Sequence, residues 1–166
     1  MTDDGGVGQL PPQVERELAS ELAELTLELA APEELAVFPE TAEEYFDDPQ
    51  AVLDPKRRDE AVGFGLDAAL LTPFVLAVAT PVIQFLVAAV GDAVLEESKP
   101  LVARLIRRLF RRDDQAPEPP DRAAPLSVDQ ARQVREIAYQ RAKGLGLSEN
   151  QATTLADSMV GSLLVR

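Results

Sequence analysis

The feature that most constrains this chain is an internal run without charge. The 24 residues from Ala68 to Gly91 contain no Asp, Glu, Lys or Arg, and only Thr72, Thr80 and Gln84 carry polar side chains there. A helix of about 20 apolar residues spans the ~30 Å hydrocarbon layer of a bilayer. The run therefore predicts either a membrane-inserted helix over 68–91 or a helix buried in a soluble core.

Two prolines inside the run keep both alternatives open. Thr72-Pro73 and Thr80-Pro81 each have the pattern of a helix start, a capping threonine followed by Pro at the first helical position. Two true starts would divide the run into pieces too short to span a membrane. Membrane helices, however, tolerate an internal proline better than soluble helices do.

Small or weakly polar residues recur at helical spacing along the same run. In lipid, such a stripe lets two helices approach closely, and an amide such as Gln84 bonds across the pair, which predicts possible homo-oligomers. In a soluble bundle the stripe would instead be the less buried face. The candidate helix-packing stripe consists of Ala77, Thr80, Gln84, Ala88 and Gly91.

A basic amphipathic helix is expected over residues 98–112. A basic amphipathic helix directly after an apolar run favours a headgroup layer that contains anionic lipid, and its arginine face could equally pair with acidic residues of the same chain. Lys and Arg are more frequent after the uncharged run than before it, which places the C-terminal side in the cytoplasm if the run spans a membrane. The candidate lipid or acidic-partner surface consists of Arg104, Arg107, Arg108, Arg111 and Arg112.

The net charge of −13 lies entirely in the first third of the chain. Residues 1–60 hold 17 acidic and 4 basic residues, whereas residues 61–166 hold 12 of each. A polyanionic segment repels phosphate backbones, so we expect no nucleic-acid partner. The bias of 13 Arg over 3 Lys is typical of a bacterial protein from a GC-rich genome.

The segment before the uncharged run is expected to be a disordered lead (1–12) and an acidic helical and irregular part (13–60). A helix over 13–31 would place a leucine-rich stripe on one face, with Leu27 off that stripe. A short helix Thr41–Phe46 is predicted from a capping box between Thr41 and Glu44. The stripe consists of Val14, Leu18, Leu22, Leu25 and Leu29.

A proline-rich linker (113–125) separates the part 61–112 from a predicted helical hairpin (126–166). Capping boxes start its two helices, Ser127 with Gln130 and Ser148 with Gln151, and Gly144 is the expected left-handed C-cap. The linker is expected to uncouple the hairpin, which would dock a protein partner through Leu155, Met159 and Leu163. The hairpin is similar to the first helix pair of anti-sigma histidine-kinase-like ATPase domains, but that family's nucleotide motifs do not follow it.

The chain has no His and no Cys, which excludes His-dependent triads, thiol nucleophiles and thiolate metal sites. Phosphate-binding glycine motifs are missing. The carboxylates of residues 40–48 lack the alternating ligands and central glycine of a calcium loop. We therefore expect a protein that is not an enzyme and has no catalytic residues, cofactor or metal.

The sequence thus predicts an all-α protein of amphipathic and apolar helices with a C-terminal αα-hairpin. The leading functional hypothesis is a small non-enzymatic membrane-associated adaptor, anchored through 61–112, that presents the hairpin 126–166 to a protein partner. One alternative is a membrane-permeabilising, pore-forming effector that oligomerises through the central helix. A further alternative is a soluble, cytoplasmic helical regulatory protein in which 61–112 belongs to the core.

Overall fold

The computed structural model describes residues 10–56, 70–91 and 126–164. Within these ranges the regular structure is helical throughout, so the predicted all-α class is confirmed. The expected lead, the basic helix 98–112 and the linker 113–125 lie wholly or largely outside the described residues. The elements are α1 (Pro12–Ala30), the 3-10 helix η1 (Pro32–Ala36), α2 (Phe38–Asp47), α3 (Pro49–Leu53), α5 (Thr72–Gly91), α7 (Val128–Gly144) and α8 (Glu149–Leu164).

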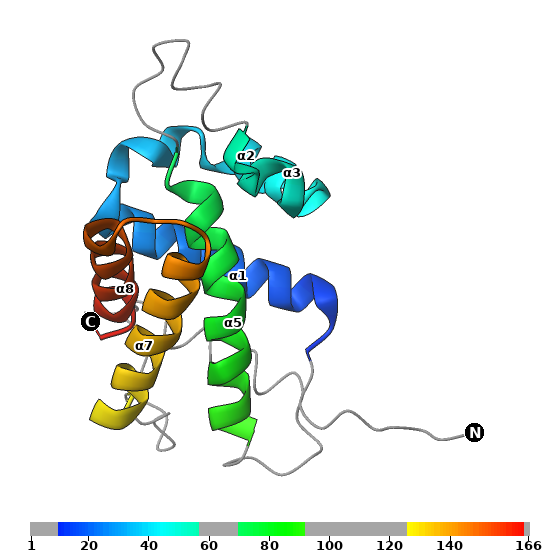
Figure 1. Ribbon diagram of the computed structural model, residues 1–166. Coiled ribbons are helices and arrows are strands. Elements are labelled where there is room, and N and C mark those ends of the chain that lie inside the picture. Colours follow the sequence, from blue (N-terminus) through cyan, green and yellow to red (C-terminus); the bar gives the residue numbers. More distant parts are fainter. Residues whose placement is uncertain (1–9, 57–69, 92–125, 165–166) are drawn as a thin grey trace.

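The apolar helix α5 lies at the centre of the described helices (Figure 1). It packs against α1, which crosses it, and against α7, which runs alongside. The short helices α2 and α3 contact α5 as well, and α8 packs on α1 and α7. Four elements from both ends of the chain, α1, α2, α3 and α7, therefore pack around α5.

The uncharged run forms one continuous helix rather than two. Thr72 and Pro73 stand at the start of α5, as their pattern predicts, but Thr80 and Pro81 lie inside it. Proline has no N–H, so Pro81 cannot donate the helical hydrogen bond to the Ala77 carbonyl. The helix continues because the surrounding apolar contacts outweigh this local loss.

The buried face of α1 differs from the leucine stripe predicted for it. Leu27, expected off the stripe, is fully buried, whereas Leu29, expected on it, is 50% exposed. The buried set also includes Ala19, Ala23 and Thr26. Small side chains let neighbouring helices approach closely, so the contact line follows them rather than the row of leucines.

The helix α2 begins before the predicted capping box. It starts at Phe38, and Thr41 lies inside it with its hydroxyl donating to the Val37 carbonyl oxygen at 2.9 Å. The prediction of a capping box between Thr41 and Glu44 is therefore wrong. Pro39 explains the earlier start, because a proline is tolerated in the first helical turn, where its missing N–H is not needed.

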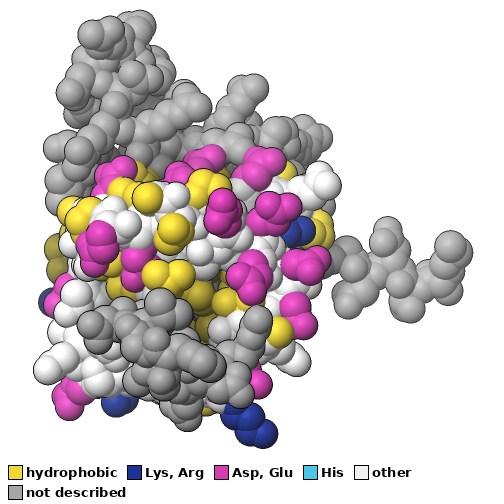
Figure 2. Space-filling model, turned by 90° about the horizontal axis from the view of Figure 1, so that it is seen from above, with side chains coloured by type: hydrophobic (Ala, Val, Ile, Leu, Met, Phe, Trp, Pro, Cys, Tyr) yellow, Lys and Arg dark blue, Asp and Glu magenta, His cyan; other side chains and the backbone are white. Residues whose placement is uncertain are grey.

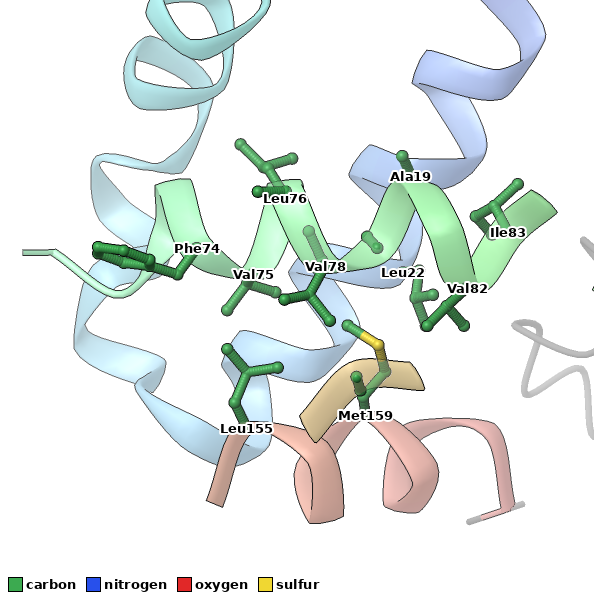
Figure 3. Close-up of a cluster of buried hydrophobic side chains, with 14 of the residues drawn as sticks. Ala19, Leu22, Phe74, Val75, Leu76, Val78, Val82, Ile83, Leu155 and Met159 are labelled. Carbon is green, nitrogen blue, oxygen red and sulfur yellow. The ribbon is translucent and has the colours of Figure 1, made fainter. Parts of the chain in front are cut away.

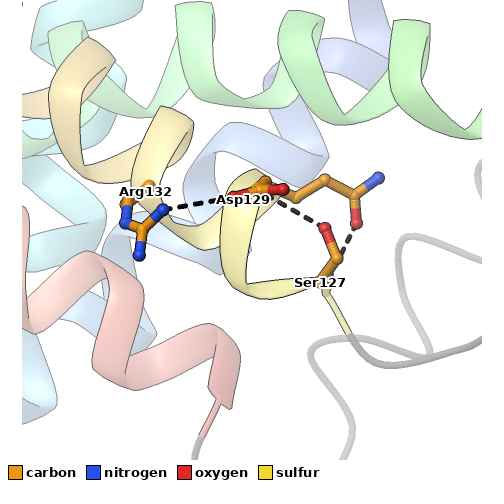
Figure 4. Close-up of polar contacts among 4 residues, drawn as sticks. Ser127, Asp129 and Arg132 are labelled. Atoms are coloured by element: carbon orange, nitrogen blue, oxygen red, sulfur yellow. Dashed lines mark hydrogen bonds and ion pairs between the residues drawn. The ribbon is translucent and has the colours of Figure 1, made fainter.

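Both capping boxes of the hairpin are confirmed. The backbone amide of Gln130 donates to Ser127 Oγ at 3.1 Å, and the backbone amide of Ser127 donates to Gln130 Oε1 at 2.9 Å (Figure 4). The equivalent bonds between Ser148 and Gln151 are 3.2 and 3.1 Å long. A capping box joins residues only three positions apart, so local sequence predicted these two, although the same pattern at Thr41 and Glu44 formed none.

The turn between α7 and α8 uses a different glycine from the predicted one. Gly144 is still helical, and Gly146 adopts the left-handed conformation with φ of 90°. The Leu147 amide donates to the Ala142 carbonyl and the Gly146 amide to the Lys143 carbonyl. These two bonds form a Schellman motif, in which the left-handed residue is the second after the last helical residue.

Candidate functional site

The first half of α5 is buried on all sides. The eight consecutive residues Thr72–Ala79 are all buried, so no face of these two turns reaches the surface. Figure 3 shows Val75 and Val78 pointing toward Leu155 and Met159 of the hairpin. A soluble helix that is apolar all round must be covered all round, and here α1, α2, α3 and α7 pack against α5, with Leu155 and Met159 of α8 facing it.

The second half of α5 has one open face, and the predicted helix-packing stripe lies along it. Thr80 is half-buried, and Gln84 and Ala88 are exposed, whereas Ala77 in the first half is buried. Gly91 is the last residue of α5, and its exposure is outside the described part of the structure. This half of the stripe thus has the position that the soluble-bundle interpretation assigned to it.

A carboxylate from another element holds the start of α5. Glu34 of η1 accepts hydrogen bonds from the Leu71 amide at 2.7 Å, the Thr72 amide at 2.8 Å and the Thr72 hydroxyl at 2.6 Å. We call these three bonds the Glu34 clamp. The first amides of a helix have no partner within the helix, and a negative charge beside them also interacts favourably with the helix dipole.

The Glu34 clamp escaped the sequence analysis, which treated Thr72 as an ordinary N-cap. The partners are separated by 37 and 38 positions, so no local pattern connects them. One signal was nevertheless present, because a Glu next to a short proline-started turn precedes a helix that has no acidic residue in its own first turn.

The predicted docking residues of the hairpin lie in the core of the same chain. Leu155 and Met159 are fully buried and Leu163 is 4% exposed. The hairpin packs on α1 through α8 and on α5 through α7, so it is not set apart from the other helices. A partner would reach these three side chains only after the hairpin separated from α1 and α5.

The five arginines of the predicted basic surface, Arg104, Arg107, Arg108, Arg111 and Arg112, lie outside the described residues. The acidic part of the molecule is described. On the face shown in Figure 2, carboxylates are interleaved with apolar side chains. Burial, followed by the nearby charges of Glu21 and Glu28, raises the pKa of the Glu24 carboxyl above its ordinary value.

A small aromatic cluster joins α2 to α1. The Arg16 guanidinium lies 4.5 Å from the centre of the Phe46 ring, and the Tyr45 and Phe46 rings meet edge-to-face at 5.3 Å. Burial raises the pKa of the Tyr45 hydroxyl, and the charge of Arg141 opposes this with a smaller effect. The cluster anchors the acidic helix α2 beside α5 and places no nucleophile near a base.

Among the described residues, no group of three or more Asp or Glu side chains is arranged to hold a metal ion. The carboxylates of residues 40–48 are distributed around α2, and Glu40, Glu43 and Asp47 are exposed.

One described helix, α5, is long and apolar enough to cross a membrane. Of its most apolar window, Thr72–Ala89, 67% is buried inside the protein. The core helix of a soluble protein meets the same criteria of length and composition, so this property is weak evidence for membrane association.

Comparisons with known protein families, with curated proteins and with solved structures find no match to this chain.

Proposed function

We propose that the protein is a non-enzymatic helical regulatory protein that acts through protein–protein contacts, with α5 as its core helix. The observation that carries this proposal is the complete burial of Thr72–Ala79 by helices from both ends of the chain. A helix used as a permanent anchor would have no need of amphipathic helices that cover it. The charge of the N-terminal part indicates what kind of partner surface it would contact. Residues 10–56 carry 13 acidic and 2 basic residues, so they favour a cationic partner surface.

Absence of catalytic groups supports the non-enzymatic part of this proposal. The chain lacks His and Cys altogether. The described carboxylates lie on helix surfaces or, for Glu34, are already occupied by backbone amides. The Thr72 hydroxyl, which donates to Glu34 at 2.6 Å, is fully buried within the clamp.

The test is fractionation of the full chain after lysis without detergent. We expect the protein in the supernatant after ultracentrifugation, with a size in gel filtration that does not change when detergent is added. Recovery in the membrane pellet, with release only by detergent, would contradict the proposal.

A buried cysteine adds a second readout, because the natural chain has none. In the variant Ala79→Cys, the thiol should be protected from a water-soluble reagent until denaturant is added. The matched control Ala88→Cys lies on the exposed side of α5 and should react at once. Equal reactivity of the two thiols would mean that α5 is not covered in solution.

A membrane-associated adaptor is the second candidate. The length and composition of Thr72–Ala89 favour it, and the predicted basic surface at Arg104–Arg112 would contribute attraction to anionic lipid. The pore-forming alternative has less support, since the first part of its packing stripe, at Ala77, is buried. Dye leakage from vesicles would separate a pore former from an adaptor.

A further inference from the structure

We propose that α5 is a conditional membrane helix, held in the bundle by the Glu34 clamp and competent to enter a lipid bilayer once that clamp opens. This inference goes beyond the regulatory function, because it concerns a second state of the chain. It stands on three observations about α5: its composition, the kind of contacts that hold it, and the surface next to its first residue.

Composition makes α5 suitable for both environments. Its 20 residues contain no charged side chain. The window Thr72–Ala89 has the length of a membrane span, and an internal proline such as Pro81 is tolerated in membrane helices. The same side chains that fill the protein core would face lipid tails without change.

The apolar side chains of α5 itself are suited to either environment. Lipid tails are as apolar as leucine, so α5 can exchange its contacts with α1 and α7 for contacts with lipid, provided that the apolar faces of α1 and α7 then meet the bilayer or each other. Polar contacts cannot be exchanged in this way. In the described part of the chain, two polar side chains join α5 to other elements: Glu34 through the clamp, and Glu15, whose carboxylate is 3.4 Å from Gln84 Nε2.

The Glu34 clamp is the stronger of these two polar contacts. Its bonds are 2.6–2.8 Å long and involve a charged acceptor, and Thr72 is fully buried. Hydrogen bonds to charged groups are stronger than neutral ones. A carboxylate is costly inside hydrocarbon, so Glu34 cannot accompany α5 into a bilayer. The three bonds must therefore break before α5 can leave the bundle.

Exposed apolar side chains lie next to the clamp on both segments that form it. Val37, three residues after Glu34, is 39% exposed, and Leu70, two residues before Thr72, is 41% exposed. These side chains give a bilayer surface apolar groups to contact close to the start of α5.

The experiment is flotation of the full chain with phosphatidylcholine vesicles, comparing the wild type with Glu34→Gln. The variant keeps the side-chain shape, removes the charge and leaves one amide oxygen where two carboxylate oxygens accepted bonds. We expect the floated fraction to rise about tenfold, the order of change that the loss of a charged hydrogen bond produces in an equilibrium. The wild type should stay in the bottom fraction.

The matched control is Glu33→Gln. Glu33 is the exposed neighbour on the same turn, so this variant has the same change in net charge and leaves the clamp intact. It should float no more than the wild type. Equal flotation of the two Gln variants, or of the wild type and Glu34→Gln, would overturn the proposal.

A double variant identifies the inserted segment. Ile83→Arg in the Glu34→Gln background places a charge near the centre of α5, which is costly in a bilayer. If α5 inserts, the double variant should lose the gained flotation. If flotation reflects only sticky, partly unfolded protein, the further destabilised double variant will float as much or more, and the proposal fails.

A fluorescent label on Ala88→Cys gives a direct signal, because Ala88 is exposed in the bundle. With vesicles, an environment-sensitive dye there should shift to shorter wavelength in the Glu34→Gln background and stay unchanged with Glu33→Gln. If circular dichroism finds Glu34→Gln unfolded, Thr72→Val removes only the hydroxyl bond and should still raise flotation. A lower melting temperature without added flotation in Thr72→Val would mean that the clamp only stabilises the fold.

Discussion

The two halves of α5 have similar composition and different surroundings. Residues Thr72–Ala79 are covered on every side and fastened by Glu34, whereas Thr80–Ala89 leave Gln84 and Ala88 open to solvent. The difference comes from what packs against each half. The helix α2 and the 3-10 helix η1 approach the start of α5, whereas α1 crosses it and α7 runs alongside (Figure 1). The two halves of α5 are similarly hydrophobic but lie in different environments, so the same kind of substitution should have different effects in each half.

The largest expected effect comes from charge in the covered half. Leu76→Arg buries an unpaired guanidinium at a fully buried position and should cost about 3–5 kcal/mol or more, which is comparable to the whole stability of a small domain. Gln84→Arg, on the open side, should change stability by less than about 0.5 kcal/mol. Chemical denaturation followed by circular dichroism measures both. Similar losses for the two variants would remove the distinction between the halves.

Larger side chains should also distinguish the two halves of α5, with a smaller loss of stability. Ala79→Leu adds three carbons where the side chain is fully buried, and we expect a loss of about 1–3 kcal/mol from overpacking. Ala88→Leu adds the same atoms on the exposed side and should be nearly neutral. Melting temperatures give the comparison. A stable Ala79→Leu variant would mean that α5 has room to move within its cover.

Substitutions at Thr72 and Thr80 compare the hydrogen bonds made by a threonine in each half of α5. Thr72→Val removes a 2.6 Å bond to a carboxylate and should cost about 1.5–3 kcal/mol. Thr80→Val removes only a 3.4 Å contact with the Leu76 carbonyl and should have little effect. Because both changes are isosteric, differences in denaturation midpoint report the hydrogen bonds alone. Equal midpoints would indicate that the clamp contributes little.

The smallest expected effect lies in the cover rather than in α5. The pKa of Glu24 is raised, so its charged form opposes folding above the folded-state pKa, and this penalty disappears as the pH falls through that value. Glu24 is largely exposed and solvent screens its charge, so Glu24→Gln should stabilise the protein by at most about 0.5 kcal/mol near neutral pH. The gain should vanish in acid. A gain of equal size at low pH would point to a cause other than charge.

Local chemistry was predictable in part from the sequence, since the capping box expected at Thr41 and Glu44 did not form, and tertiary placement was not predictable. The boxes at Ser127 and Ser148 need partners three residues away, and both formed as expected. The start of α5 at Thr72 followed from Thr-Pro, but the identical pattern at Thr80 did not start a helix. Whether a Thr-Pro pair opens a helix or lies within one depends on what the preceding turn packs against.

The remaining errors share one physical origin. The buried face of α1 follows Ala19 and Ala23 rather than the leucine row, because α5 approaches closely over small residues. Leu155 and Met159 were correctly placed on an apolar face, but the partner that covers this face is the chain itself. The sequence identifies which surfaces need a partner, and only the fold determines which partner they have.

The order of the helices along the chain has a consequence for synthesis. The helix α5 ends at Gly91, and the hairpin that completes its cover ends at Leu164. At about 5–20 residues per second, a ribosome needs roughly 4–15 s to make the intervening chain. Throughout that interval α5 has been synthesised while the hairpin is still incomplete. A nascent chain of this protein therefore presents a segment of membrane-like composition to chaperones and targeting factors before its fold can close.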